Sequence, residues 1–432
     1  MAQNGYHIKF EHSTELITDK TGLLLVDEFW KKFNLNDMID NAFGKPGSNR
    51  GIMASKYVRT LVELIIDGGT HLEDVRKLEA DTAYKKLIGI KSYPTSDAIG
   101  DWLRRQGELG GEKKMWHIIS QLLKMNKDKE LILDVDATLI QSDKGDGKKS
   151  YEGIVGYHPL LGMTVENGLC IGSRFRFGNE YAGADLLGFI KECNRNIGNR
   201  VKIVRSDSAG YNHEIINYCD EVGKYFIITA DRDNSVMEAV NKIERSQWVW
   251  GKNEDGSKAK WQIAETSHTM NETKKAFRLV IKRRKIIGQL GLFNQDGYSY
   301  WMLVTNLPEE KYSSNDIILF QHDRGEMERL IGEFKNHFNM EHMPCGQLTA
   351  NSVYFTIGVL AYNIIQLIKE ISLDKEWLKR SIRSIRYNII HLPSKIISSS
   401  RYLVSKIVCA KELFECFVFA YNRLRYAPFA PS

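Results

Sequence analysis

Two aspartates inside an apolar strand constrain the fold of this chain more than any other feature. Residues 131–138 are mostly apolar, include β-branched side chains and follow a polar run, which predicts a short core strand. Side chains alternate along a strand, so Asp134 and Asp136 project from the same face. An ionised carboxylate in a dry interior must meet a cation, a metal ion or solvent. The simpler interpretation is an aspartate at a strand end that caps the next turn.

The composition indicates a globular protein with more than one domain. A chain of 432 residues is long for a single core, so two or three domains are expected. The net charge of +6 favours a polyanionic partner without establishing one. The six cysteines show neither a Cys-x2-Cys pair nor zinc-like spacing, and the N-terminus lacks the pattern of a secretory signal. We therefore expect a cytosolic protein.

Residues 1–128 show the periodicity of several helices. Gly68 and Gly69 would end one of them, and another follows residues 94–97. Short helices joined by tight turns, with basic residues near the end of the region, suit a helical DNA-binding domain of the helix-turn-helix kind. A small helical domain of any other purpose has the same pattern.

Residues 129–231 change to strand patterns. Two strands of a meander are followed, between residues 201 and 231, by a strand, a helix and a strand, which predicts a parallel βαβ unit. In open α/β sheets the chemistry lies outside the carboxyl ends of the strands. Asp136, Asp207 and Asp231 all lie at such ends.

Residues 232–310 read as an antiparallel β-rich insertion with turn signals between its strands. The region is rich in tryptophan and basic residues, a mixture that suits a surface which stacks bases and neutralises phosphates. Interior packing is the more common role of any one sheet tryptophan. The candidates for DNA contact are Trp248, Trp250, Trp261, Trp301, Arg283 and Arg284.

Residues 311–345 contain the most informative helix, predicted over residues 314–338. On a regular helix, Arg324, Glu328 and Lys335 fall on one stripe about 40° wide. The stripe adjoins an apolar arc, so Glu328 lies at the edge of the buried face. The simpler interpretation is a salt-bridge ladder on the surface of an amphipathic helix.

Residues 346–432 are predicted to be helical and basic. The longest apolar stretch, residues 353–368, is interrupted by Asn363 and Gln366 and is too short and polar for a membrane span, so we expect a buried helix. From residue 369 onward, twelve Lys and Arg face five Asp and Glu. Such an excess would suit a phosphate-binding face.

Three carboxylates from separate elements would meet at one edge of the predicted sheet. Asp136 and Asp207 end strands, and Glu328 lies on a helix after the β-rich insertion. Such a set suits two Mg²⁺ ions about 4 Å apart in a phosphoryl-transfer site. Arg324 and Lys335, on the stripe of Glu328, would then contact phosphates beside the scissile bond.

With these motifs in order, the chain resembles an insertion-sequence transposase of the DDE class. That family carries a Tyr-x2-Arg-x3-Glu-x6-Lys signature, which Arg324, Glu328 and Lys335 match, whereas Gln321 occupies the tyrosine position. The Asp-x-Thr motif of the family matches residues 136–138, and its second motif, which contains Asp207, matches residues 205–208. The resemblance also covers residues 69–74, 94–96 and 176–179.

The resemblance implies an α/β fold with a ribonuclease-H-like mixed sheet core, interrupted by an antiparallel β insertion and flanked by helical N-terminal and C-terminal regions. It implies a metal triad of Asp136, Asp207 and Glu328 with two Mg²⁺ ions, for which Mn²⁺ would substitute. It also implies cut-and-paste transposition, in which each transposon end is cut and the freed 3′-hydroxyl attacks target DNA. In related proteins the cut proceeds through a hairpin, with an insertion tryptophan near a flipped base.

The partners implied are double-stranded DNA, as terminal inverted repeats and target DNA, and a second copy of the chain in a synaptic complex. No membrane is expected, and the compartment would be the bacterial cytoplasm beside the nucleoid. Two alternatives remain open: a nuclease that lacks strand transfer, and a domesticated DNA-binding protein without catalysis. The roles of Asp134 and Asp231 also remain open.

Overall fold

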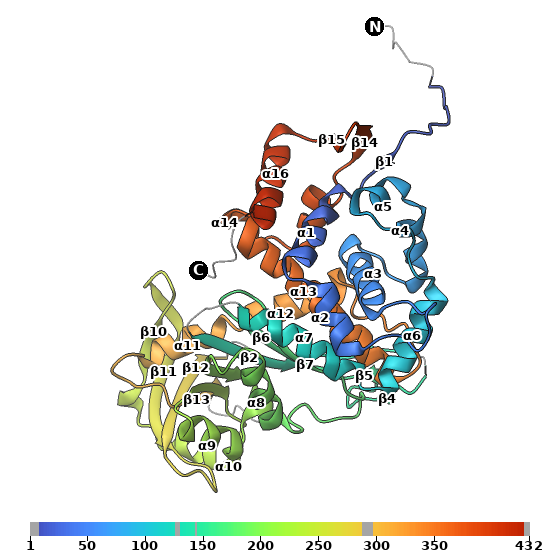
Figure 1. Ribbon diagram of the computed structural model, residues 1–432. Helices are drawn as coiled ribbons and strands as arrows, with labels where there is room; N and C mark the ends of the chain where they lie inside the picture. Colours follow the sequence, from blue (N-terminus) through green and yellow to red (C-terminus); the bar gives the residue numbers. More distant parts are fainter. Residues whose placement is uncertain (1–7, 126–129, 143–144, 287–296, 427–432) are drawn as a thin grey trace.

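The computed structural model describes residues 8–125, 130–142, 145–286 and 297–426 (Figure 1). The N-terminal residues considered for a secretory signal lie outside these ranges, as does the boundary predicted between the first two segments. The division into five segments therefore remains a prediction.

Helices of the first segment pack around a long helix from the C-terminal part of the chain. The first segment forms α1 (Leu24–Lys32), α2 (Leu35–Phe43), α3 (Ala54–Asp67), α4 (Val75–Ala80), α5 (Thr82–Ile88), α6 (Ser96–Glu108) and α7 (Gly111–Met125). The long helix, α13 (Leu348–Ser372), contacts α3, α6 and α7. Gly107 allows the closest approach, because a Cβ there would lie 2.7 Å from the backbone nitrogen of Ala350. The two helical regions thus share a core.

Helix α13 is the buried helix expected from the apolar stretch. By length and composition it could cross a membrane, but 89% of its apolar window is buried inside the protein. The predicted helix end at Gly68 is confirmed, and the helix expected after residues 94–97 starts two residues earlier, at Ser96. Gly68 ends α3 with a φ of 98°, and Thr95 caps α6 by accepting a hydrogen bond from the Ala98 N–H at 3.2 Å.

The core sheet has the predicted mixed topology. Strand β2 (Leu131–Ala137) pairs antiparallel with β6 (Leu160–Thr164), which pairs antiparallel with β7 (Cys170–Arg174). On its other side β2 pairs parallel with β8 (Val201–Ser206), and β8 pairs parallel with β9 (Tyr225–Thr229). Helix α8 (Leu186–Asn196) precedes β8, and α9 (His213–Glu221) completes the βαβ unit. The order β7-β6-β2-β8-β9 is the ribonuclease-H-like arrangement expected from the sequence.

The β-rich insertion extends the core sheet instead of forming a separate one. Its strands are β10 (Val249–Lys252), β11 (Lys258–His268), β12 (Phe277–Lys285) and β13 (Tyr298–Thr305), preceded by α10 (Asn234–Asn241). Strand β13 pairs antiparallel with β9 of the core. Within the part of the chain that the structure describes, nine strands form this sheet. Short strands β3 (Ile140–Gln141), β4 (Lys148–Lys149) and β5 (Val155–Tyr157) form a small sheet after β2.

The prediction of a single helix over residues 314–338 is wrong. The chain forms α11 (Ser314–His322), α12 (Gly325–Gly332) and a π-helical turn (Glu333–His337). The break coincides with a hydrogen bond from a distant segment of the chain. The Phe320 carbonyl accepts a hydrogen bond from the Arg205 side chain, and the Arg324 N–H bonds to the Gln321 carbonyl at 3.2 Å.

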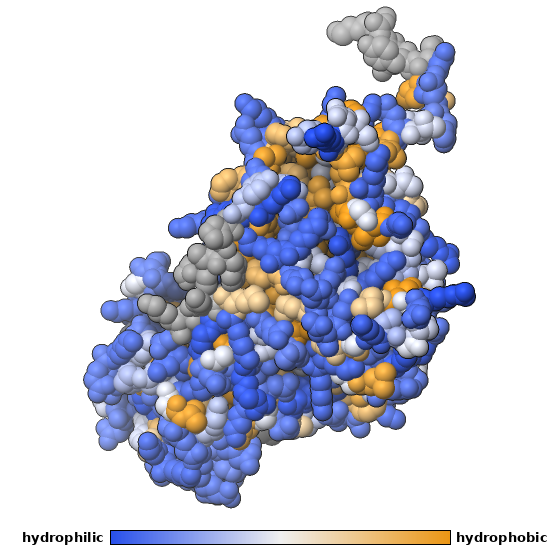
Figure 2. All heavy atoms as spheres, viewed as in Figure 1, coloured by the Kyte–Doolittle hydropathy of each residue, from blue (hydrophilic) through white to orange (hydrophobic). Residues whose placement is uncertain are grey.

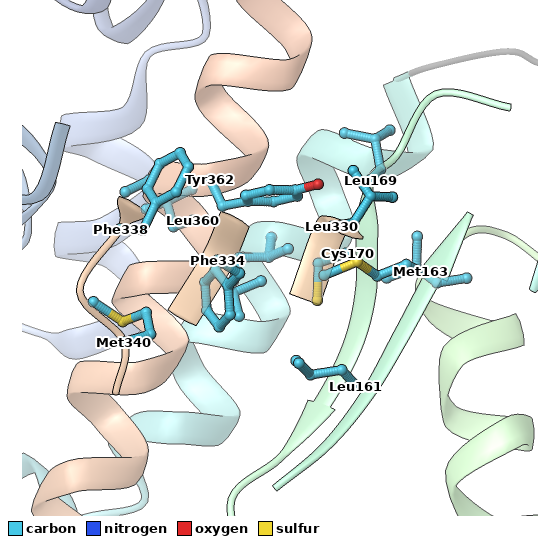
Figure 3. Packing of buried hydrophobic residues seen from close by; sticks show 14 of the residues in the cluster. Leu161, Met163, Leu169, Cys170, Leu330, Phe334, Phe338, Met340, Leu360 and Tyr362 are labelled. Atoms are coloured by element: carbon cyan, nitrogen blue, oxygen red, sulfur yellow. The ribbon is translucent and has the colours of Figure 1, made fainter. Parts of the chain in front are cut away.

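Packing nevertheless fixes α12 firmly. Figure 3 shows Leu330 beside Cys170 of the core sheet, and Phe334 and Phe338 beside Tyr362 of α13. Phe334 contacts Tyr362 edge to face, with ring centroids 5.7 Å apart. The helix that carries Glu328 is therefore held between the core sheet and α13.

The C-terminal region is less helical than predicted. After α14 (Lys375–Leu378), α15 (Ile382–Ile385) and a π-helical turn (Arg386–Ile390), a hairpin of β14 (Ser394–Ser399) and β15 (Tyr402–Ile407) precedes α16 (Lys411–Tyr426). Strand β14 also pairs with β1 (Ile17–Thr18). The turn between β14 and β15 contains Ser400, which has a positive φ.

The predicted basic face of this region is incomplete. Lys369 is buried and donates to the Arg380 carbonyl at 3.0 Å, while Arg386 donates to carbonyls of α3. Figure 2 shows apolar residues gathered around β14, β15 and α16. Leu403 and Phe419 are among the exposed large hydrophobic side chains of these elements. The exposed charge is therefore interleaved with apolar side chains.

Candidate active site

Asp134 is a buried ion-pair residue. Its side chain is fully enclosed, and both carboxylate oxygens accept hydrogen bonds from Arg205, each at 2.6 Å from Nε or Nη2. Arg205 itself has no exposed surface, and its Nη1 donates to the Phe320 carbonyl. The cation that a buried Asp134 requires is thus supplied by the neighbouring strand.

Asp136, two residues further along β2, has a different environment. Its side chain is 21% exposed, and its nearest cation is Arg324, with Nη2 3.4 Å from Oδ2. Burial, helped by the charges of Asp207 and Glu328, raises the pKa of Asp136 to about 6 against the lowering effects of Arg324 and the Ala137 N–H. The three carboxylates of the predicted triad therefore lie within electrostatic reach of one another.

Asp207 and Glu328 complete the set from separate elements. Asp207 follows β8, caps a short 3-10 turn (Ser208–Gly210) and accepts from the Ala209 N–H at 3.1 Å. Glu328 is exposed in the first turn of α12. The all-carboxylate donor set is chemically suited to Mg²⁺. Among the described residues, however, no group of three or more His, Cys, Asp and Glu side chains is close enough to hold a metal ion.

The two predicted phosphate-binding cations flank Asp136. Arg324 begins α12, and its Nη2 donates to the Val135 carbonyl at 3.1 Å. Lys335, in the π-helical turn, donates to the Leu139 carbonyl at 2.7 Å. The regular stripe predicted from helix geometry is broken, yet both cations still reach the end of β2. The Nε of Arg324 is buried without a hydrogen-bond partner among the described residues.

Gln321, at the tyrosine position of the signature, faces the interior. Its side chain is 3% exposed, and Nε2 donates to the Ser206 carbonyl at 3.1 Å. The amide oxygen is buried with no partner within the described ranges. This side chain is therefore engaged with the residue that precedes Asp207.

An aromatic and cationic cluster lies at the end of α11, and sequence reasoning missed two of its members. The Lys282 Nζ lies 5.1 and 5.2 Å from the ring centroids of Trp261 and Trp301 and 2.6 Å from His322 Nε2. His322 stacks on Trp301 with centroids 5.2 Å apart. Desolvation lowers the pKa of Lys282 and, together with the Lys282 charge, that of His322. We call these four residues the Lys282 cluster.

The other insertion candidates lie elsewhere. Alternation along β12 places Arg283 on the face opposite Lys282. Arg283 stacks on Trp248 at 3.9 Å, and Trp248 is 8% exposed. Trp250 is 53% exposed on β10, the outermost strand of the sheet. Arg284 is exposed near the end of β12. Strand register, which sequence periodicity does not supply, places Arg283 and Trp248 on the face opposite the Lys282 cluster, whereas Arg284 shares the face of Lys282.

Asp231 and the N-terminal motif, residues 69–74 and 94–96, are outside the contacts described above for the triad. Asp231 is exposed after β9. Burial raises the pKa of Tyr211 most, and the charges of Asp233 and Asp231 raise it as well. Residues of the motif line a polar cavity of about 520 Å³ between the helical region and β3. Its lining includes Thr70, His71, Glu73, Ser96, Arg104, Gln141 and His342.

Comparison with known proteins adds family membership to this geometry. Residues 2–427 match the family described as transposase DDE domain group 1. None of the curated proteins compared with the chain matches it.

Two solved structures show weak similarity. A piggyBac transposase in a synaptic complex with hairpin DNA has 11% sequence identity and a TM-score of 0.44; the alignment covers 88% of this chain and 82% of that one. A Drosophila P element transposase in a strand transfer complex has 12% identity and a TM-score of 0.24, covering 54% and 52%. Similarity at this level assigns no residue or role.

The family match extends over nearly the whole chain and includes the strand of Asp136, the strand before Asp207 and the helix of Glu328. This chain belongs to the transposase DDE domain group 1 family.

Proposed function

We propose that this transposase cuts DNA at transposon ends and joins the freed 3′-hydroxyl to target DNA, with Asp136, Asp207 and Glu328 as its metal-binding carboxylates. Two observations support the proposal: Asp136 and Asp207 directly follow the paired residues Val135 and Ser206 of neighbouring strands, and the three carboxylates are electrostatically coupled. Asp207 and Glu328 come from different elements, and both raise the pKa of Asp136. Repulsion of this kind is relieved when a divalent cation binds among the carboxylates.

The metal would be Mg²⁺, with Mn²⁺ as a substitute, because the donors are hard carboxylate oxygens. Two such ions activate the attacking hydroxyl and stabilise the leaving oxygen of an in-line phosphoryl transfer. The protein's own contribution is to hold Asp136 at a strand end, Asp207 on the neighbouring strand and Glu328 on a helix packed against α13.

Arg324 and Lys335 are proposed to hold the phosphates on either side of the scissile bond. Arg324 now donates to the carbonyl of Val135, next to Asp136, at 3.1 Å, and Lys335 donates to the carbonyl of Leu139, three residues after Asp136, at 2.7 Å. A guanidinium can bind a phosphate through two parallel hydrogen bonds, and the Nε of Arg324 is an unused donor among the described residues. Arg324 and Lys335 can therefore replace their hydrogen bonds to backbone carbonyls with hydrogen bonds to phosphate oxygens.

The Lys282 cluster is proposed as the part of the insertion that contacts the DNA strand. Trp301 is partly exposed, and Arg284 lies on the same face of β12 as Lys282. Aromatic rings beside lysine and arginine can stack on bases while the cations neutralise phosphates.

The proposed assembly is a pair of chains that brings two terminal inverted repeats together before insertion into target DNA. The proposed compartment is the bacterial cytoplasm beside the nucleoid, where such DNA is accessible.

The test uses the full chain with DNA taken from the flanks of its own gene, Mg²⁺ or Mn²⁺, and a supercoiled target plasmid. Wild type should nick the end fragment and join it to the plasmid. Asp207→Ala and Glu328→Ala should abolish both steps. Asp231→Ala removes an exposed carboxylate from the end of the next strand and serves as the matched control, with cleavage retained.

Each alternative has a distinct outcome. Cleavage without joined product would indicate a nuclease that lacks strand transfer. Binding without cleavage would indicate a domesticated DNA-binding protein, and absence of inverted repeats around the gene would agree with it. Cleavage by Asp207→Ala at the wild-type rate would refute the proposed site. End binding should also weaken steeply with salt, because cations at the interface displace counterions from the phosphates.

A further inference from the structure

One buried arginine joins β8, β2 and α11, the helix that precedes the one carrying Glu328. Arg205 of β8 forms two 2.6 Å hydrogen bonds with Asp134 of β2 and a third with the Phe320 carbonyl at the end of α11. We propose that Arg205 is a positioning residue, which sets the mutual geometry of the metal-binding carboxylates through Asp134 and Phe320. This inference rests on the proposed function of the triad.

The spacing along the chain makes the connection short. Asp134 lies two residues before Asp136 on β2, and Arg205 lies two residues before Asp207 at the end of β8. Two residues of strand span about 7 Å and return the side chain to the same face. The arginine therefore fixes the relative height of two strands directly beneath their carboxylates.

The third element is joined at the helix break. The Phe320 carbonyl bonds to Arg205, and the Arg324 N–H bonds to the Gln321 carbonyl instead of to Phe320; α11 ends at His322, and Arg324 is the N-cap of α12. Gln321 adds a second link through its 3.1 Å hydrogen bond to the Ser206 carbonyl. The orientation of α12, and with it Glu328, follows from contacts made one turn earlier.

Stability alone gives little reason for this arrangement. Replacing a buried ion pair with well-packed apolar residues is often neutral or stabilising, because both charges must be desolvated. Lysine cannot reproduce the planar fork that serves Asp134 and Phe320 at once. Partners that orient metal ligands, in contrast, typically contribute about 10–100-fold to metal affinity or activity.

The sheet contains a matched control. Arg278 of β12 forms a similar pair with Glu265 of β11, at 2.6 and 2.8 Å, and also donates to the Leu307 and Tyr312 carbonyls. The Arg278 pair is somewhat more exposed, and it lies in the insertion, where it adjoins none of the three carboxylates. Loss of its geometry should affect the fold without moving the triad.

The experiment measures Mn²⁺ binding to full-length protein by titration calorimetry and electron paramagnetic resonance, without DNA. Arg205→Lys should weaken Mn²⁺ binding about 10–100-fold, whereas Arg278→Lys should leave it unchanged. Thermal melting and far-ultraviolet circular dichroism establish that each variant is folded. Wild-type affinity in folded Arg205→Lys, or an equal loss in Arg278→Lys, would overturn the inference.

A double variant separates geometry from stability if Arg205→Lys folds poorly. Asp134→Leu with Arg205→Met replaces the ion pair by apolar side chains of similar size. It should fold and still bind Mn²⁺ weakly, and wild-type affinity in this variant would contradict the positioning role. Wild-type protein that binds Mn²⁺ through Asp136 and Asp207 but never cuts DNA would refute the proposed function and leave the positioning role intact.

Discussion

Asp134 and Asp136 lie two residues apart on one strand and have opposite environments. Asp134 is fully buried and matched by the planar fork of Arg205 at 2.6 Å. Asp136 is partly exposed, is paired with Arg324 across 3.4 Å, and is opposed by Asp207 and Glu328. The interior aspartate is satisfied within the protein, whereas the strand-end aspartate is left with excess negative charge.

This difference shows how position along one strand separates structure from chemistry. Strand β8 runs beside both residues, but only at the depth of Asp134 does it present an arginine. At the depth of Asp136 it ends in a carboxylate. A buried charge that is fully paired stabilises geometry, and a carboxylate among other carboxylates is prepared for a cation.

The largest expected effect follows removal of the buried charge. Asp134→Asn should lower the free energy of unfolding by about 3–5 kcal/mol, because Arg205 is left buried without its counter-charge. Urea denaturation at pH 7.5 in EDTA measures the loss. A change as small as that of a surface substitution would show that the pair is not matched as described.

The same substitution at Asp136 should change the free energy of unfolding in the opposite direction. Since the folded pKa of about 6 lies above the ordinary value of 3.8, protonated Asp136 stabilises the fold below about pH 4, and this contribution is lost as the pH rises through 6. Asp136→Asn should therefore raise the free energy of unfolding by about 1–3 kcal/mol at pH 7.5 in EDTA. The gain should vanish toward pH 4. Destabilisation across the whole pH range would contradict the convergence of the carboxylates.

A smaller effect is expected from the cation that faces Asp136. Arg324→Met should raise the pKa of Asp136, because the guanidinium charge lowers it in the wild type. Carboxyl ¹³C NMR in EDTA follows this titration. Lys335→Met is the matched control, since Lys335 is bonded to the Leu139 carbonyl and should leave the titration nearly unchanged.

The smallest expected effect concerns the outer end of the same region. Burial and then Lys282 lower the pKa of His322 below 6.5. Lys282→Met should move that pKa upward, measured by ¹H–¹⁵N NMR of the imidazole. Lys258→Met removes a comparable cation from the Trp250 ring and should leave His322 unchanged. Equal shifts in both variants would show that the Lys282 cluster is not a local unit.

Much of the fold was predictable because its signals are local. The apolar alternation of β2, the βαβ unit from β8 to β9 and the buried helix α13 are each encoded within a few dozen neighbouring residues. The break between α11 and α12 was not predictable, because its cause is a side chain 115 residues away along the chain. The hairpin of β14 and β15 was missed because a run of isoleucines and serines suits either a helix or a strand.

The sequence by itself determined where strands and helices follow one another along the chain and which carboxylates the proposed chemistry requires. Residue type and periodicity are local properties, and a local pattern is enough to show them. Tertiary structure decided which charges meet. Asp134 and Arg205 are 71 residues apart, and their pairing depends on the register between two strands. Register likewise placed Lys282 with Trp261 and Trp301, and Arg283 on the opposite face. Pairing across strands depends on the folded arrangement of distant segments, which a local pattern does not contain.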